Sequence, residues 1–233
     1  MKIAAFFIPE LKPGKYNVKD ERLDQVDKIT KAKKKTYIQV EVAGEDALLD
    51  ADCLVVPKDS AADIILQDLE FIETRSSRAA EEKEKAFLGK LKGILEKEEF
   101  IFGISLDEEE KKLISSYGLA SNRPVVISGK EDLEDPNALL SRCVRESGFI
   151  SFFTTGEKET RAWLIKKGIT AHEAAGSIHS DIQRGFIRAE IISFNDFISL
   201  GGETAAKQAG KMRLEPKEYV MQDADLVNFR FNK

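Results

Sequence analysis

Four short apolar runs indicate that the first part of the chain forms an α/β sheet. They cover residues 2–8, 37–42, 53–56 and 124–127. Continuous apolar runs of this length are typical of strands that are buried on both faces of a parallel sheet. We therefore predict a small sheet that is assembled from these segments.

Between the third and fourth runs, the apolar positions change to a helical spacing. Ile65, Leu69 and Ile72 share one helix face, and a second apolar stripe lies within residues 87–95 among many Lys and Glu residues. A third helix is expected to start at a group of acidic residues near 107 and to end at Gly118. These segments predict a helical arm at about residues 60–118, inserted between strands. A compact bundle of solvated helices is the alternative that the pattern leaves open.

From residue 149 onwards the pattern returns to alternation with a period of two. Strands are predicted at residues 151–155, 161–165, 189–192, 219–221 and 226–231. The first two form a hairpin around 156–159, and the capping-box sequence from Thr170 to Glu173 predicts a helix after them. This order of elements indicates a β-grasp fold. Its core is predicted to contain Phe152, Trp163, Phe186, Phe197 and Phe229.

Composition supports a folded protein and excludes several function classes. The 233 residues are 42% hydrophobic and 33% charged, so long disordered and fibrous structures are excluded. The 36 basic and 41 acidic residues give a net charge of −5, which excludes a basic field over the whole molecule. Residues 1–148 carry a net charge of −6 and residues 149–233 carry +1. Any contact with nucleic acid must therefore involve a local patch.

Few residues suggest metal or redox chemistry. Cys53 and Cys143 are isolated in the sequence, which is typical of a protein in a reducing cytoplasm. His172 and His179 lack a third ligand, so no metal site is predicted. No apolar run approaches the ~18 residues that a transmembrane helix requires, so no membrane partner is expected.

The C-terminal motifs resemble one particular family. The sequence of residues 152–163 is followed by Ala175–Asp181 and 185–190, then by 209–215 and by the terminal segment 227–231. Their order and spacing over about eighty residues resemble the TGS-like C-terminal domain of YchF-type proteins, a branch of the Obg-related P-loop GTPases. The resemblance implies a G-domain-derived, Rossmann-like α/β domain at residues 1–148, trimmed in this chain, and a β-grasp TGS-like domain at 149–233.

The phosphate loop that this family uses is degenerate in the first domain. Gly14 and Lys15 match the family's loop, but Pro9 replaces its first glycine and Tyr16 replaces its metal-binding Ser or Thr. Proline has no amide hydrogen to donate to a phosphate. The helix that follows the loop in the family is also missing. We expect no bound cofactor, whereas an intact loop would imply ATP or GTP with magnesium.

The other nucleotide motifs are altered as well. The switch sequence is matched by 41–44, with Glu41 in place of aspartate and with Gly44 retained. The base-reading motif is matched at 128–131, where Glu131 remains but the asparagine is absent. No catalytic residue is therefore predicted. A divergent ATPase or GTPase of the YchF family, whose phosphate loop lies elsewhere in the alignment, is the alternative.

Basic residues are the remaining candidates for function. The half of the chain that is not acidic carries Lys166, Lys167, Arg188, Lys207, Lys211 and Arg213. Phosphate contacts need such charges on one face, although a solvated surface accounts for the same pattern. The resemblance implies a ribosome, RNA or translation-linked protein as partner, bound by the TGS-like domain and the arm. The sequence thus predicts a noncatalytic, cytoplasmic binding or regulatory protein.

Overall fold

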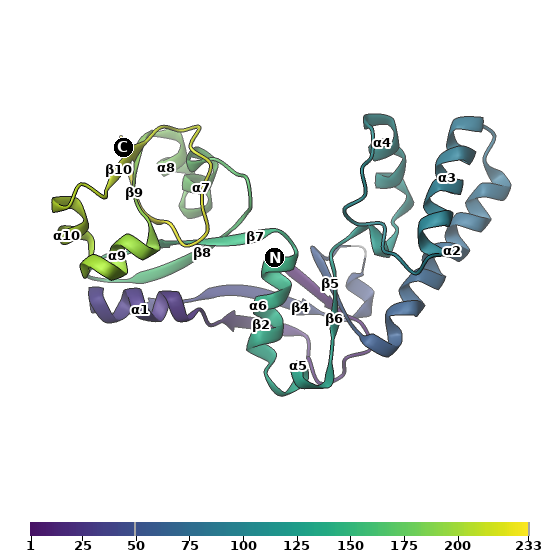
Figure 1. Cartoon of the computed structure of the whole chain (residues 1–233), viewed down its shortest axis with the longest axis horizontal. Helices are drawn as coiled ribbons and strands as arrows, with labels where there is room; N and C mark the ends of the chain where they lie inside the picture. Colours follow the sequence, from purple (N-terminus) through teal and green to yellow (C-terminus); the bar gives the residue numbers. More distant parts are fainter. Residues whose placement is uncertain (49, 233) are drawn as a thin grey trace. The chain divides into compact units, whose positions relative to one another are not determined.

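The computed structural model describes residues 1–48 and 50–232. Interresidue contacts divide the chain into two units, each built from two segments. Unit 1 consists of Met1–Tyr16 and Val40–Ser147, and unit 2 consists of Asn17–Gln39 and Gly148–Lys233. Each unit contains a sheet with helices packed on it (Figure 1).

The sheet of unit 1 is largely parallel, as the apolar runs predicted. Its strand order is β2-β4-β1-β5-β6, with β1 paired in parallel to both β4 and β5, and β5 paired in parallel to β6. The strands are β1 (Lys2–Ala5), β2 (Gly14–Val18), β4 (Ile38–Ala43), β5 (Cys53–Pro57) and β6 (Val125–Ser128). Successive residues of β5 are buried, because this strand is covered on both faces.

Three successive helices of unit 1 form the predicted arm (Figure 1). They are α2 (Ala61–Arg78), α3 (Glu82–Leu95) and α4 (Glu108–Tyr117), and they surround an apolar cluster that includes Ile72, Leu88, Leu91 and Ile101. Asp107 and Glu110 form a capping box at the start of α4, and Gly118 ends it with a φ of 65°. Helices α5 (Lys130–Glu134) and α6 (Pro136–Glu146) complete the unit.

The sheet of unit 2 has the predicted β-grasp topology. Its strand order is β10-β9-β11-β7-β8-β3, in which β7 and β8 form an antiparallel hairpin and β11 lies parallel to β7. The C-terminal strands are β7 (Phe149–Thr154), β8 (Thr160–Lys166), β9 (Phe186–Ile192), β10 (Arg213–Glu215) and β11 (Leu226–Phe231). The helices of this part are α7 (Ala171–Ile178), α8 (Ser180–Arg184), α9 (Phe194–Leu200) and α10 (Glu203–Gln208).

The core of unit 2 lies between α7 and the sheet. Phe152 and Phe229 are buried in it and Phe197 is buried elsewhere in the unit, as predicted, whereas Trp163 and Phe186 are only partly buried at the edge of this core. The predicted strand at 219–221 is wrong. Only one isolated bridge forms there, between Thr170 and Val220, because the chain turns towards the start of β11.

The segment Asn17–Gln39 was not expected in unit 2. The sequence-based boundary after residue 148 assigned it to the first domain, but helix α1 (Glu21–Thr30) packs on β8 and α9. Strand β3 (Lys35–Thr36) then extends the sheet by pairing in parallel with β8. Within the described residues, no helix is long and apolar enough to cross a membrane.

Candidate functional site

The nucleotide-motif remnants of unit 1 do not converge on one site at the carboxyl end of β1, because Glu41 lies opposite Lys2 at the start of that strand. After β1 the chain forms a loop and then enters β2, an edge strand that starts at Gly14. Lys15 is therefore exposed on a strand. A phosphate loop instead leads into a helix, whose N-terminal amides point at the phosphates. That group of amides is missing from this position.

A shallow apolar cleft occupies the corresponding end of the sheet. Its volume is about 470 Å³, and it is lined by Ala5, Phe7, Ile8, Pro9, Leu11, Pro13, Gly44 and Glu45. The amide of Phe7 donates to Glu45 Oε1 at 3.2 Å, and the amide of Leu11 donates to the carbonyl oxygen of Ile8 at 3.2 Å. This cleft does not fit the phosphates of a magnesium nucleotide. Its two prolines have no amide hydrogen to donate, the amides of Phe7 and Leu11 are already hydrogen-bonded, and the carboxylate of Glu45 would repel a phosphate.

The remaining motif residues lie outside this cleft. Glu41 is exposed on β4, and Glu131 is exposed on α5. The carboxylate of Glu131 folds back over Gly129, while Asp132 Oδ2 accepts a hydrogen bond from the Gly129 amide at 2.7 Å. Of the five sequence-predicted remnants, therefore, only Gly44 lines the cleft.

Unit 2 presents a different kind of site, a basic sheet face on β9 and β11. Arg188 lies directly opposite Arg230 in the antiparallel register, and Glu190 lies opposite Asn228. Side chains alternate between the two faces of a strand. These four residues therefore share the face that is turned away from the core beneath α7, whereas Ala189 faces that core.

Glu190 is the buried carboxylate of this face, with only 6% of its surface exposed. It forms an ion pair with Arg230, and its Oε2 accepts a hydrogen bond from Asn228 Nδ2 at 2.7 Å. Burial acts to raise the pKa of the Glu190 carboxyl, but these two bonds and the charges of Arg230 and Lys207 outweigh burial and hold the pKa below its ordinary value. Glu190 is therefore an anion at neutral pH.

A polar cleft of about 720 Å³ lies next to this face, where β9 ends and β10 begins. Its lining includes Lys211, Arg213 and Asp196. Lys211 Nζ lies 3.5 Å from Asp196 Oδ1, and the Arg213 guanidinium donates to the hydroxyl of Tyr219 at 3.1 Å. Both cations keep half of their side-chain surface exposed. They therefore remain accessible to an anionic partner.

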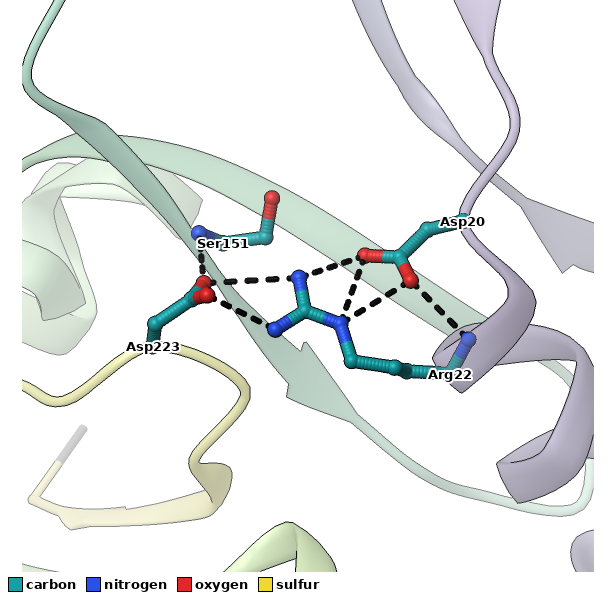
Figure 2. A network of polar contacts seen from close by, with 4 residues as sticks. All are labelled: Asp20, Arg22, Ser151 and Asp223. Carbon is teal, nitrogen blue, oxygen red and sulfur yellow. Dashed lines mark hydrogen bonds and ion pairs between the residues drawn. The ribbon is translucent and has the colours of Figure 1, made fainter. Parts of the chain in front are cut away.

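Arg22 closes one side of this cleft and fixes α1 to the sheet. Figure 2 shows its guanidinium between the carboxylates of Asp20 and Asp223. The Asp223 carboxylate accepts from Arg22 Nη1 at 2.7 Å and from the Ser151 amide of β7 at 3.0 Å. Because both carboxylates bind it, Arg22 is a structural tie and not an open phosphate site.

The structure thus divides the six basic residues that the sequence suggested. Arg188 and Lys207 lie around Glu190, and Lys211 and Arg213 line the polar cleft. Lys166 and Lys167 lie at the end of β8, which is separated from β9 by β7 and β11. Sequence reasoning missed Arg230, although the alternation of 226–231 could have placed it on the same face as Asn228.

Comparisons with known proteins agree with this class of structure, an α/β domain combined with a β-grasp unit. Residues 149–232 match the family YchF-GTPase_C, described as "Protein of unknown function (DUF933)". The "Ribosome-binding ATPase YchF" of Bacillus subtilis (strain 168) is 34% identical over a match that covers 73% of this chain and 64% of that protein. The protein of the same name from Escherichia coli O157:H7 is 51% identical over 104 residues, covering 43% and 28%.

A solved structure shows the same fold. The YchF GTPase of Schizosaccharomyces pombe matches with a TM-score of 0.75 and 20% sequence identity, covering 96% of this chain and 88% of that chain. The chain is thus similar to YchF-type proteins, and its residues 149–232 match the model of their C-terminal family. It spans about two thirds or less of the length of the curated relatives, since its matches cover 64% and 28% of the two proteins above.

Proposed function

We propose that this chain is a ribosome-associated YchF relative that acts without binding or hydrolysing a nucleotide. The observation that carries the proposal is the contrast between its two sites. The end of β1 forms an apolar cleft with engaged amides, whereas unit 2 keeps a basic face around Glu190 and a polar cleft beside it. A protein with this distribution has lost the means to hold phosphates in unit 1 and kept the means to bind them in unit 2.

The relatives support the choice of partner. Two of them bear the name ribosome-binding ATPase, and the family model matches residues 149–232, which make up most of unit 2. We infer a cytoplasmic setting, in which the C-terminal unit contacts ribosomal RNA and the arm provides a second contact surface. A divergent ATPase or GTPase is the second candidate, favoured only by the family's name and by the retained Gly14 and Lys15.

Cosedimentation with bacterial ribosomes at several salt concentrations tests the partner. We expect the triple variant Lys207→Ala, Lys211→Ala, Arg213→Ala to bind more weakly than the wild type. Its salt slope, d log K/d log [salt], should decrease in magnitude by up to about 2, which corresponds to three lost contacts with single-stranded phosphates. Stability should hardly change, because all three side chains are exposed.

A matched triple variant provides the control. Lys158→Ala, Arg184→Ala, Lys217→Ala removes the same charge from exposed positions of unit 2 that lie outside both the basic face and the polar cleft. It should bind like the wild type. Equal losses in the two variants would show that only net charge matters, and no binding of the wild type would reject the ribosome as partner. ATP or GTP with magnesium should leave the bound fraction unchanged.

A further inference from the structure

We infer that Arg188 and Arg230, opposed across β9 and β11, form a binding site for the phosphates of single-stranded RNA. This inference deepens the proposed ribosome association and rests on it for the natural partner. The site itself is defined by the sheet register, in which Arg230 pairs with Arg188 and Asn228 pairs with Glu190.

The charges on this face do not balance. Like charges that lie directly opposite each other in an antiparallel pair destabilise a sheet. One carboxylate, Glu190, lies beside the two arginines, and its two oxygens are already engaged by Arg230 and Asn228. In the part of the chain that the structure describes, Arg188 makes no ion pair and no side-chain hydrogen bond. One guanidinium is therefore left for an external anion.

Phosphate is the anion that fits this arrangement. A guanidinium presents its donors in a planar fork that matches phosphate oxygens, and such charge-assisted bonds are stronger than those between neutral groups. Arg230 is held at one end by Glu190 but keeps 52% of its side-chain surface exposed. The two arginines can therefore contact one phosphate together or two successive phosphates of a strand.

A single strand fits better than a duplex because the face also offers apolar contact. Leu214 of β10 lies opposite Glu190 in the register, on the same face, and 59% of its surface is exposed. Unpaired bases stack on aromatic rings or on guanidinium planes, so this face can combine phosphate contacts with stacking on an arginine beside the apolar surface of Leu214. Lys207 lies close enough to influence the charge of Glu190, and it adds a further cation at the rim.

Fluorescence anisotropy of a labelled single-stranded RNA dodecamer with the full chain tests the site. We expect Arg188→Ala to weaken binding about tenfold and to reduce the salt slope by about 0.7, the contribution of one single-stranded phosphate. Arg188→Lys should restore the slope but only part of the affinity, because it keeps the charge and loses the fork. Lys158→Ala, which removes one charge from the β7–β8 turn, should behave like the wild type.

The possible results distinguish a failure of this phosphate site from a failure of the proposed ribosome association. Unchanged affinity and slope in Arg188→Ala, or a wild type that does not bind the oligonucleotide, would overturn the phosphate site even if ribosomes cosediment. Oligonucleotide binding that depends on Arg188, without any ribosome cosedimentation, would support the site and reject the ribosome as partner. Within the described residues the Arg188 side chain makes no hydrogen bond or ion pair, so its removal should not cause a loss of folding that would confuse the result.

Discussion

The basic face of unit 2 is stabilised by one buried carboxylate. Glu190 neutralises Arg230 and leaves Arg188 unmatched, so the fold keeps a positive charge at a position where it gains no stability from it. Buried ions need a partner, whereas exposed ones do not. We therefore expect Glu190 to be needed for stability and Arg188 to be needed for binding.

The pH dependence of stability should reveal the role of Glu190. Its pKa is lowered in the folded state, so its stabilising effect is present above the ordinary value of 4.5 and is lost as the pH falls through the folded pKa. Glu190→Gln should lower the free energy of unfolding at neutral pH by about 1–2 kcal/mol. Urea unfolding at pH 7 and at about pH 3 should show that the difference from wild type shrinks in acid.

An exposed glutamate gives the matched control for this measurement. Glu218→Gln changes a side chain of unit 2 that is 68% exposed and whose Oε1 forms a long ion pair, 3.9 Å from Lys217 Nζ. Because exposed ion pairs contribute little to stability, this substitution should hardly alter the free energy of unfolding at either pH. If Glu190→Gln destabilised the protein equally at both pH values, the loss would come from packing or hydrogen-bond geometry, and the assigned charge role would be wrong.

Residues with local signals were predictable, and residues with partners far away in the sequence were not. Gly118 and the Thr170–Glu173 box follow from neighbouring residues alone, and the structure confirms both. The contact between Glu190 and Arg230 joins positions forty residues apart. It depends on the register between β9 and β11, which the sequence of either strand does not specify.

At the scale of elements, the segment Asn17–Gln39 is the main departure from the expected organisation. Helix α1 covers part of the sheet of unit 2 with Leu23 and Val26, both fully buried. The hydroxyls of Thr30 and Thr160 are 2.7 Å apart, and the Thr160 amide donates to the Lys34 carbonyl oxygen at 2.9 Å. We interpret this segment as an integral part of the β-grasp unit.

Truncating Leu23 should therefore destabilise unit 2. Leu23→Ala removes a side chain with no exposed surface, and such a change costs about 2–5 kcal/mol. Trp163, the single tryptophan, lies on β8, so its fluorescence reports unfolding of the sheet on which α1 packs. The midpoint of urea unfolding followed at Trp163 should decrease markedly.

The same helix provides the control. Gln25 is exposed on α1, and Gln25→Ala should leave the Trp163 midpoint nearly unchanged. Equal midpoints in Leu23→Ala and Gln25→Ala would mean that α1 is not needed for the stability of the sheet. In that case the boundary at residue 148 would be an adequate description of the folding units.

Strand β3 shows why the sequence did not assign the segment Asn17–Gln39 to unit 2. Strand β3 has only two residues, Lys35 and Thr36, and neither is apolar. Its pairing with β8 crosses more than a hundred residues of chain. Periodicity detects which face of an element is apolar, but it does not identify the surface against which that face packs.

At the scale of the whole chain, the two units differ in the kind of binding surface that they present. Unit 1 keeps the parallel strands and the arm, while the segment after β1 leads into an edge strand instead of a helix. Unit 2 keeps the complete β-grasp topology and its basic face. The loss of nucleotide chemistry that we propose for unit 1 thus involves the backbone path as well as the side chains.

Restoring the metal-binding hydroxyl should therefore fail to restore nucleotide binding. In the wild type, Tyr16 lies on β2 and its hydroxyl donates to the Lys12 carbonyl oxygen at 2.7 Å. Tyr16→Ser supplies the missing residue type but no helix N-terminus. Tyr16→Ser combined with Glu45→Ala would also free the Phe7 amide, yet Pro9 would still lack a donor. We expect no saturable heat in calorimetric titrations of either variant with micromolar ATP or GTP and magnesium.

The wild type is the decisive comparison in this experiment. Saturable binding by the wild type that Lys15→Ala abolishes would show that the loop still holds phosphates, and it would favour the divergent ATPase or GTPase. Binding that appears only in the repaired variants would show that side chains, not the backbone path, are the limiting defect. We expect neither result, because a strand cannot present consecutive amides to one phosphate as a helix N-terminus does.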